Sequence, residues 1–251
     1  MAYEPLDRLR NFTTARIGLG RVGVSLPTTR VIEFQAAHAE ARDAIQEPFE
    51  PEFLITELRE FSPIRVTSKA VDRRAYIERP DEGRRLDSAS RQSLTGRFDC
   101  TLILADGLSA RAARAHGAAL VRAIRSETSD WNWAPLVIAE RSRVALGDEI
   151  ASAFGSELVV ILIGERPGLS SPDSLGAYIT FAPAPGATTD ANRNCVSNIR
   201  PAGLPIEVGA RKVVSIARLA RVRGLTGISI KEDEALALHG GKLQPIAAKD
   251  D

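Results

Sequence analysis

The sequence predicts an α/β protein in which helices cover both faces of a parallel sheet, with a smaller helical or irregular region before it. Its 251 residues suffice for one large domain, or for one domain with a smaller lobe. From about residue 97, short apolar runs rich in β-branched residues alternate with helical patterns, which is typical of such a sheet. We therefore expect an N-terminal region at 1–95, an α/β domain at 96–230 and a polar tail at 231–251.

The N-terminal region is charged and irregular apart from one helix that we expect after Pro27. Apolar side chains and one histidine recur on a single face at helical spacing there: Val31, Phe34, His38, Ala41 and Ile45. A histidine in this setting is more often a core or interface residue than a ligand. The charged segment "YIERPDEGRRL" at 76–86 is either a solvated charge run or, because Pro80 and Gly83 punctuate it, a fixed contact-making loop.

The stretch "GLGRVG" at 18–23 matches the dinucleotide fingerprint G-x-G-x-x-G. The fingerprint needs an apolar strand before it and a helix after it, so that a pyrophosphate meets a helix N-terminus. Here "NFTTARI" precedes and "VSLPTT" follows. We therefore favour a turn, or a loop that wraps around backbone, and not a site for a nicotinamide dinucleotide.

The α/β domain is expected to contain four strands and three helices. The strands are expected at 100–104, 135–139, 158–163 and 177–183, and the helices at 109–127, near 147–154 and at about 206–223. The third strand, "LVVILI", is the most hydrophobic of them. It stops abruptly at the polar sequence "GERPG", which raises the question of what lies at that edge of the sheet.

Polar residues follow every predicted strand, at 106–109, 140–144, 164–168 and in the long loop 186–205. Because the carboxyl ends of parallel strands share one edge, we expect these segments to converge on a ligand-binding crevice. Asp106 and Ser109 could equally serve to start the following helix. A loop as long as 186–205 favours function over a simple connection.

Composition and motifs exclude several classes of function. The net charge of +1 gives no reason to expect nucleic acid, and no apolar run approaches a membrane span or a signal peptide. We expect a cytoplasmic protein in which Cys100 and Cys195 are thiols. Three histidines argue against a His-rich metal site, and the sequence has no nucleophile elbow, H-E-x-x-H, Cys-x-x-Cys or Walker motif. The pattern indicates a binding protein rather than a self-sufficient enzyme.

Five motifs carry a resemblance to a known family. They are "TARIGLGRVG" (14–23), "YIERPDEGRRL" (76–86), "DGLSA" (106–110), "VVILIGERPGL" (159–169) and "NCVSNIRPAG" (194–203). In this order they resemble the small subunit of adenosylcobalamin-dependent ethanolamine ammonia-lyase. The likeness extends from about residue 12 to about residue 225.

The resemblance implies a hetero-oligomer with a Rossmann-like cobalamin-binding domain at 96–230. In the family, a TIM-barrel large subunit binds ethanolamine and carries the catalytic residues, so none is expected on this chain, and the corrin lies between the two subunits. An adenosyl radical takes a hydrogen from ethanolamine, which then yields acetaldehyde and ammonia. The resemblance also implies that residues 1–95 contact the large subunit. The resemblance also implies the base-on form of the cofactor, which the absence of D-x-H-x-x-G from the sequence allows.

The family's cobalamin contacts fall on Val144, Glu165 and Cys195 of this sequence, with no residue expected to ligate a metal ion. Carboxamide arms of the corrin would donate to Glu165, Val144 would offer apolar contact or main chain, and Cys195 would pack as a small, soft group. Alternatively, Glu165 pairs with nearby arginines. Two other functions are kept open, a dinucleotide-binding oxidoreductase and a purely structural subunit. We do not favour a location in a bacterial microcompartment, because the segment before Thr13 is too short for an extension that would direct encapsulation.

Overall fold

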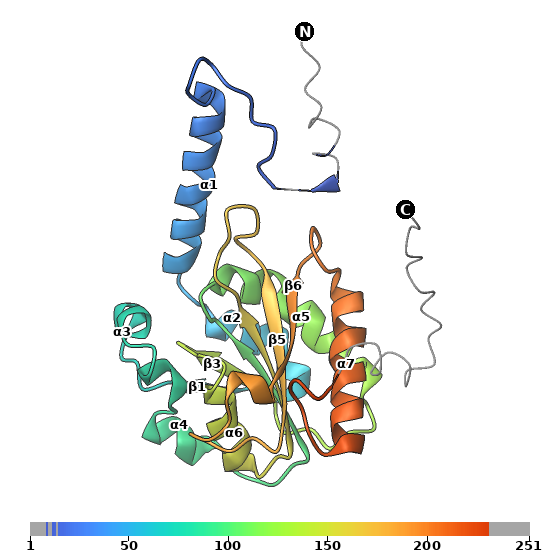
Figure 1. Cartoon of the computed structure of the whole chain (residues 1–251). Coiled ribbons are helices and arrows are strands. Elements are labelled where there is room, and N and C mark those ends of the chain that lie inside the picture. Colours follow the sequence, from blue (N-terminus) through green and yellow to red (C-terminus); the bar gives the residue numbers. More distant parts are fainter. Residues whose placement is uncertain (1–8, 10–11, 14, 231–251) are drawn as a thin grey trace, which may run out of the picture.

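The computed structural model describes residue 9, residues 12–13 and residues 15–230, and within them six strands form one sheet (Figure 1). The strands are β1 (Ile64–Thr67), β2 (Cys100–Ala105), β3 (Val137–Glu140), β4 (Leu158–Gly164), β5 (Leu175–Phe181) and β6 (Asn194–Ile199). The α-helices are α1 (Thr28–Gln46), α2 (Pro51–Glu57), α3 (Arg73–Glu78), α4 (Ser88–Ser93), α5 (Ala110–Glu127), α6 (Leu146–Phe154) and α7 (Ile206–Arg223). The α/β class is confirmed, as are the four strands and three helices expected after residue 96.

The strand order is β1-β3-β2-β4-β5-β6, and the sheet is mixed. Strands β1, β3, β2 and β4 are parallel, whereas β5 is antiparallel to β4 and β6 is antiparallel to β5. The expectation that the fourth strand is also parallel was therefore wrong. Residues 165–174 connect β4 to β5 without a helix, and so short a connection cannot provide the crossover that parallel pairing requires.

Two strands escaped the sequence analysis because they are short or polar. Strand β1 lies within the region 1–95 and pairs with β3, so the sheet draws a strand from that region as well. Strand β6 lies inside the segment 186–205 that was expected to be a loop, and four of its six residues are not buried. Neither strand has the continuous apolar run that marks a central strand.

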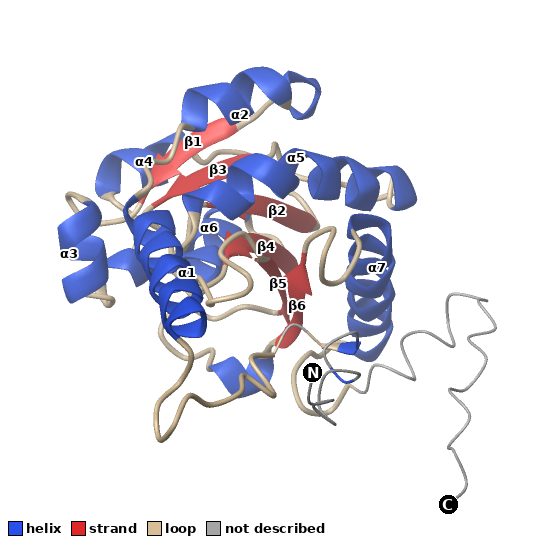
Figure 2. Ribbon diagram, turned by 90° about the horizontal axis from the view of Figure 1, so that it is seen from above, coloured by secondary structure: helices blue, strands red, loops and turns tan. Residues whose placement is uncertain are grey.

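Helices cover both faces of the sheet, as expected, and Figure 2 shows this layering from above. Alternate residues of β4 divide between the two cores, since Leu158, Val160 and Leu162 pack with α5 and α7, whereas Val159, Ile161 and Ile163 pack with α6. Helix α5 approaches β2 closely because residue 117 is glycine. A Cβ atom there would lie 2.7 Å from the Leu104 side chain.

Helix α1 occurs where the sequence predicts it, but its expected apolar face is largely uncovered. Ala41 and Ala44 are its buried residues, whereas Phe34 is exposed and the helix projects from the body of the molecule (Figure 1). His38 is also exposed and stacks on Phe34, with ring centroids 6.4 Å apart, so it is not part of this chain's core.

The segment 18–23 is a loop, as we favoured. Gly18, Gly20 and Gly23 have positive φ values, and Val22 and Ser25 form a tight two-residue bridge. No strand leads into it, and α1 begins only at Thr28. The dinucleotide fingerprint therefore lacks its structural context. None of the helices in the described residues combines the length and the apolar character needed to cross a membrane.

Candidate functional site

A cavity of about 610 Å³ lies at the carboxyl edge of the parallel strands. The segments after β2, β3 and β4 line it, so the expected convergence of these three is confirmed. The segment 186–205, expected to be one long loop, is split between the two edges of the sheet. Its residues 197–200, at the end of β6, line the cavity, but residues 186–193 lie at the opposite edge because β5 runs antiparallel. Part of the predicted convergence was therefore wrong.

The three residues inferred from the resemblance lie in or beside this cavity. Val144 and Glu165 line it, whereas Cys195 flanks it. Cys195 pairs with Tyr178 across strands β6 and β5, and Tyr178 lines the cavity. The fold thus brings together residues that are up to 51 positions apart in the sequence. Their role as cofactor contacts stays a prediction.

Glu165 is held where β4 ends. Its Oε2 atom accepts a hydrogen bond from the backbone N–H of Asn198, with N and O 3.1 Å apart. Its side chain lies over Gly176 of β5, where an added Cβ would come within 2.9 Å of Oε1. Among the described residues no arginine forms an ion pair with Glu165, so the alternative of an arginine partner finds no support there.

Tyr178 and Cys195 form a neutral pair beside this carboxylate. Exclusion of water raises the pKa of the Tyr178 hydroxyl, and the adjacent Cys195 and Glu165 raise it further. Exclusion of water also raises the pKa of the Cys195 thiol, against the lowering effect of a hydrogen bond from Tyr178, and the charge of Glu165 adds to the increase. At neutral pH Cys195 is thus a protonated, poorly nucleophilic thiol, which suits a packing role.

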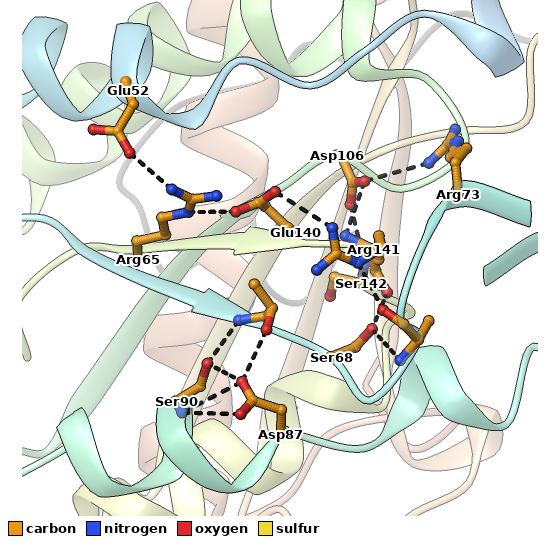
Figure 3. Close-up of polar contacts among 12 residues, drawn as sticks. Glu52, Arg65, Ser68, Arg73, Asp87, Ser90, Asp106, Glu140, Arg141 and Ser142 are labelled. Carbon is orange, nitrogen blue, oxygen red and sulfur yellow. Dashed lines mark hydrogen bonds and ion pairs between the residues drawn. The ribbon is translucent and has the colours of Figure 1, made fainter. Parts of the chain in front are cut away.

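Asp106 fixes the loop that carries Val144 (Figure 3). Its carboxylate accepts hydrogen bonds from the backbone N–H groups of Gly107 (2.8 Å), Arg141 (2.9 Å) and Ser142 (3.0 Å), and Arg73 lies 3.3 Å away. Burial raises the pKa of Asp106 to about 6, although these partners act in the opposite direction. Asp106 therefore joins the β2 and β3 loops and does not cap α5.

Ser109, and not Asp106, is the N-cap residue of α5. Its Oγ atom accepts the N–H of Ala112 at 3.2 Å, and its hydroxyl donates to the carbonyl of Pro172 at 2.8 Å. The capping interpretation is therefore confirmed for Ser109 and not for Asp106. The bond to Pro172 also fixes the segment after β4 against the start of α5.

Tyr76 braces the same loop from the side of the N-terminal region. The guanidinium carbons of Arg143 and Arg73 lie 4.3 Å and 4.9 Å from its ring centroid, and its hydroxyl donates to the carbonyl of Ser142 at 2.9 Å. Arg143 donates in turn to the Tyr76 carbonyl at 3.0 Å and, through its backbone N–H, to that of Gly83 at 2.8 Å. The segment 76–86 is thus fixed through its buried residues Tyr76, Gly83 and Leu86, whereas most of its charged side chains are exposed, so each interpretation holds in part.

A further ion-pair chain ties the N-terminal region to the sheet (Figure 3). Arg65 of β1 pairs with Glu140 of β3, and also with Glu52 of α2 at 2.9 Å. Glu140 lies 3.6 Å from the guanidinium of Arg141, the residue whose N–H is bound by Asp106. The loop after β3 is consequently held by Asp106 on one side and by the ion pairs of Glu140 on the other.

The sequence analysis did not single out Tyr76, Arg143, Tyr178 or Arg200, although Arg143 and Arg200 lie in segments that it expected at the crevice. The Nε atoms of Arg143 and Arg200 are buried and have no acceptor within the described residues. Such groups are costly unless an acceptor reaches them. Arginine is frequent throughout the sequence, so composition does not single out these two. The cavity thus combines one carboxylate acceptor, arginine donors and the apolar side chains of Val144 and Ile163.

Comparison with known proteins gives consistent results. A family model described as "Ethanolamine ammonia-lyase light chain" matches residues 3–231. The chain is 47% identical over 243 residues to a protein of Ralstonia nicotianae, covering 92% of this chain and 90% of the relative. It is 46% identical over 249 residues to one of Azotobacter vinelandii, covering 95% and 92%, and 45% identical over 241 residues to one of Pseudomonas fluorescens, covering 92% and 88%. Each relative bears the name "Ethanolamine ammonia-lyase small subunit".

Proposed function

The chain belongs to the ethanolamine ammonia-lyase light-chain family, and from this premise we propose that it holds adenosylcobalamin against a large partner subunit that carries the catalytic residues. Membership makes the chain part of an ammonia-lyase complex, and a small subunit implies a large one. The proposal concerns the cofactor, its position between the subunits and the residues that contact it.

The observation that carries the proposal is the position of Glu165 in a cavity that Arg143 and Arg200 also line. A corrin bears carboxamide arms, which donate through N–H and accept through oxygen. The carboxylate of Glu165 suits the amide N–H groups, and the guanidinium groups of Arg143 and Arg200 suit the oxygens. A corrin is also larger than this cavity, so the chain would cover one part of it and leave the remainder to the partner.

Bound adenosylcobalamin supplies the cobalt–carbon bond whose homolysis allows ethanolamine to be converted to acetaldehyde and ammonia. The residues of this chain do not take part in that chemistry. Glu165 orients the carboxamide arms, Val144 and Ile163 offer apolar contact and exclude water, and Cys195 packs beside them as a neutral thiol. Asp106 and Tyr76 keep the Val144 loop in place.

The surface that we propose for the large subunit lies in the N-terminal region. Several large apolar side chains are exposed on α1 and the loop before it: Val22, Val24, Leu26, Ile32 and Phe34. Val24 is 99% exposed, which is costly for an apolar side chain unless a partner covers it. Because a large subunit is the partner that the family implies, we assign this surface to it.

A purely structural subunit is the remaining alternative, and one experiment separates it from our proposal. The chain is co-expressed with its large subunit, adenosylcobalamin is titrated in, and the corrin absorption is followed. We expect Glu165→Gln and Cys195→Ala to weaken binding, Glu165→Gln by about tenfold, as for the loss of a hydrogen bond to a charged group. Glu207→Gln, an exposed position on α7, is the matched control. Unchanged affinity in both site variants would favour the structural subunit.

A further inference from the structure

A second cavity, of about 410 Å³, lies at the opposite edge of the sheet. It adjoins the last turn of α5 and the residues leading to β3, near Trp133, which bridges to the first residue of β2. The indole rings of Trp131 and Trp133 stack in its wall, with centroids 5.5 Å apart and planes at 25°. Hydroxyl groups and two guanidinium groups complete the lining, and none of its lining residues in the described chain is Asp or Glu.

The two arginines of this cavity differ in their partners. Arg122 donates to Glu60 at 2.9 Å and lies 3.5 Å from Glu57, so carboxylates balance its charge. Arg125 lies between two rings, with its guanidinium carbon 5.0 Å from the centroid of Phe61 and 5.4 Å from that of Trp133. The described residues provide no hydrogen-bond acceptor for it, and its NH1 atom is buried. Burial lowers the pKa of Arg125, as expected for a charge that has lost water without gaining a counter-ion.

Capping of α5 does not account for Arg125. A basic residue in the last turn often satisfies the free carbonyl groups there. In this helix other donors already do so, because Thr128 donates to the carbonyl of Ile124 at 2.7 Å and Arg218 to that of Glu127 at 2.7 Å. The indole N–H of Trp133 likewise donates to the Thr128 carbonyl at 3.2 Å. Apart from the two aromatic rings, Arg125 is therefore left without a hydrogen-bond acceptor or counter-ion among the described residues.

We propose that this cavity is a binding site for a small organic carboxylate with a flat apolar body. The carboxylate would neutralise Arg125, whose planar guanidinium matches it in shape and charge. The apolar body would lie against the indole rings, and a volume of about 410 Å³ accommodates a molecule of one ring. The site is separate from the Glu165 cavity and does not depend on the proposed cofactor.

The test uses the intrinsic fluorescence of the full-length chain, because both of its tryptophans lie at this cavity. Sodium benzoate is the probe and benzyl alcohol is its neutral counterpart. We expect a saturable fluorescence change with benzoate, and at least tenfold weaker apparent binding for benzyl alcohol. Arg125→Gln should weaken benzoate binding by at least tenfold. Arg221→Gln, whose native side chain faces Trp131 from outside the cavity lining, should keep it within twofold.

Comparing the two probes on the unmodified chain keeps the test independent of folding in the variants, and circular dichroism checks each variant. The absence of saturable binding, equal binding of benzyl alcohol, or full retention of binding in Arg125→Gln would each overturn the proposal. So would loss of benzoate binding when the large subunit is added, because the partner would then cover the cavity in the assembled protein.

Discussion

Glu165 and Asn198 connect the ends of two strands that are not neighbours in the sheet. Glu165 follows β4 and Asn198 belongs to β6, with β5 between them, and the carboxylate accepts the backbone N–H of Asn198 at 3.1 Å. Asn198 has a φ of 57°, a left-handed conformation that asparagine tolerates better than most residues. This hydrogen bond holds Glu165, the proposed cofactor contact, in place. It uses one of the two carboxylate oxygens of Glu165 and leaves the other for the cofactor.

We predict that Gly176→Ala weakens cofactor binding by the complex without unfolding the chain. The new Cβ would lie 2.9 Å from Oε1 and 3.2 Å from Cγ of Glu165, so the carboxylate must move. Gly147→Ala, where the nearest atoms lie at 3.5 Å, is the control. Corrin absorption titrations compare the two variants, and equal affinities would count against a role for the position of Glu165.

The two cysteines are predicted to differ in thiol labelling. Burial raises the pKa of Cys100 to about 12, so it should not react in the native chain. Cys195 is exposed but has a raised pKa, so it should react slowly at pH 7 and faster as the pH rises. Glu165→Gln removes a nearby negative charge and should accelerate labelling of Cys195 at constant pH. Thiol-reagent kinetics measure this, and an unchanged rate would show that the two groups do not interact.

Breaking the buried ion pair between Arg193 and Asp148 is predicted to destabilise the chain strongly. Two N–O distances of 2.7 Å join them, and both side chains are almost fully buried. Asp148→Ala leaves an unpaired buried charge and should lower the free energy of unfolding by about 3–5 kcal/mol. Glu78→Ala, which breaks the exposed pair with Arg74, should cost less than about 1 kcal/mol. Urea unfolding compares them, and similar losses would contradict this ranking.

Asp87 is predicted to give a pH-dependent contribution to stability. It begins α4 by accepting the N–H groups of Ala89 and Ser90, and Thr67 of β1 donates to it at 2.8 Å. Burial opposes ionisation, but these hydrogen bonds and the Ser90 hydroxyl together lower the pKa of Asp87. Its stabilisation is therefore present above the unfolded-state value near 3.8 and is lost as the pH falls through the lower folded-state value.

Asp87→Ala should thus cost about 1–2 kcal/mol at pH 7 and progressively less below pH 4, as measured by urea unfolding across this range. Asp81→Ala is the matched control, because Asp81 precedes a 3-10 turn without making a side-chain cap bond. A loss for Asp87→Ala that grows as the pH falls would contradict the lowered pKa.

The exposed apolar surface of the N-terminal region is predicted to act in assembly rather than in folding. Phe34→Ser should leave the thermal midpoint of the isolated chain nearly unchanged, because Phe34 is 47% exposed. The same change should weaken association with the large subunit by about tenfold, as for a truncated apolar anchor. Val222→Ser, at an exposed position on α7, is the control. Undiminished association would remove α1 from the proposed interface.

The elements with strong local patterns were predictable from the sequence. Helix α7 occupies the expected residues 206–223, and β4 extends the expected run by only one residue. The residues directly after β4, 165–168, were correctly placed at the edge of the sheet that carries the cavity, because charge directly follows a buried strand. By contrast, β1 and β6 were missed, since edge strands with polar residues lack a repeating apolar signal.

By itself the sequence determined the α/β class, the position of Glu165 at the end of a buried strand and the family, because these depend on local periodicity and on motif order. Only the tertiary structure decided that β5 turns back antiparallel, which sends residues 186–193 away from the cavity and returns Asn198 to Glu165. It also decided that Asp106, Tyr76 and Arg143 brace the Val144 loop. Strand direction and such contacts depend on pairings between distant segments, which no local pattern of residues specifies.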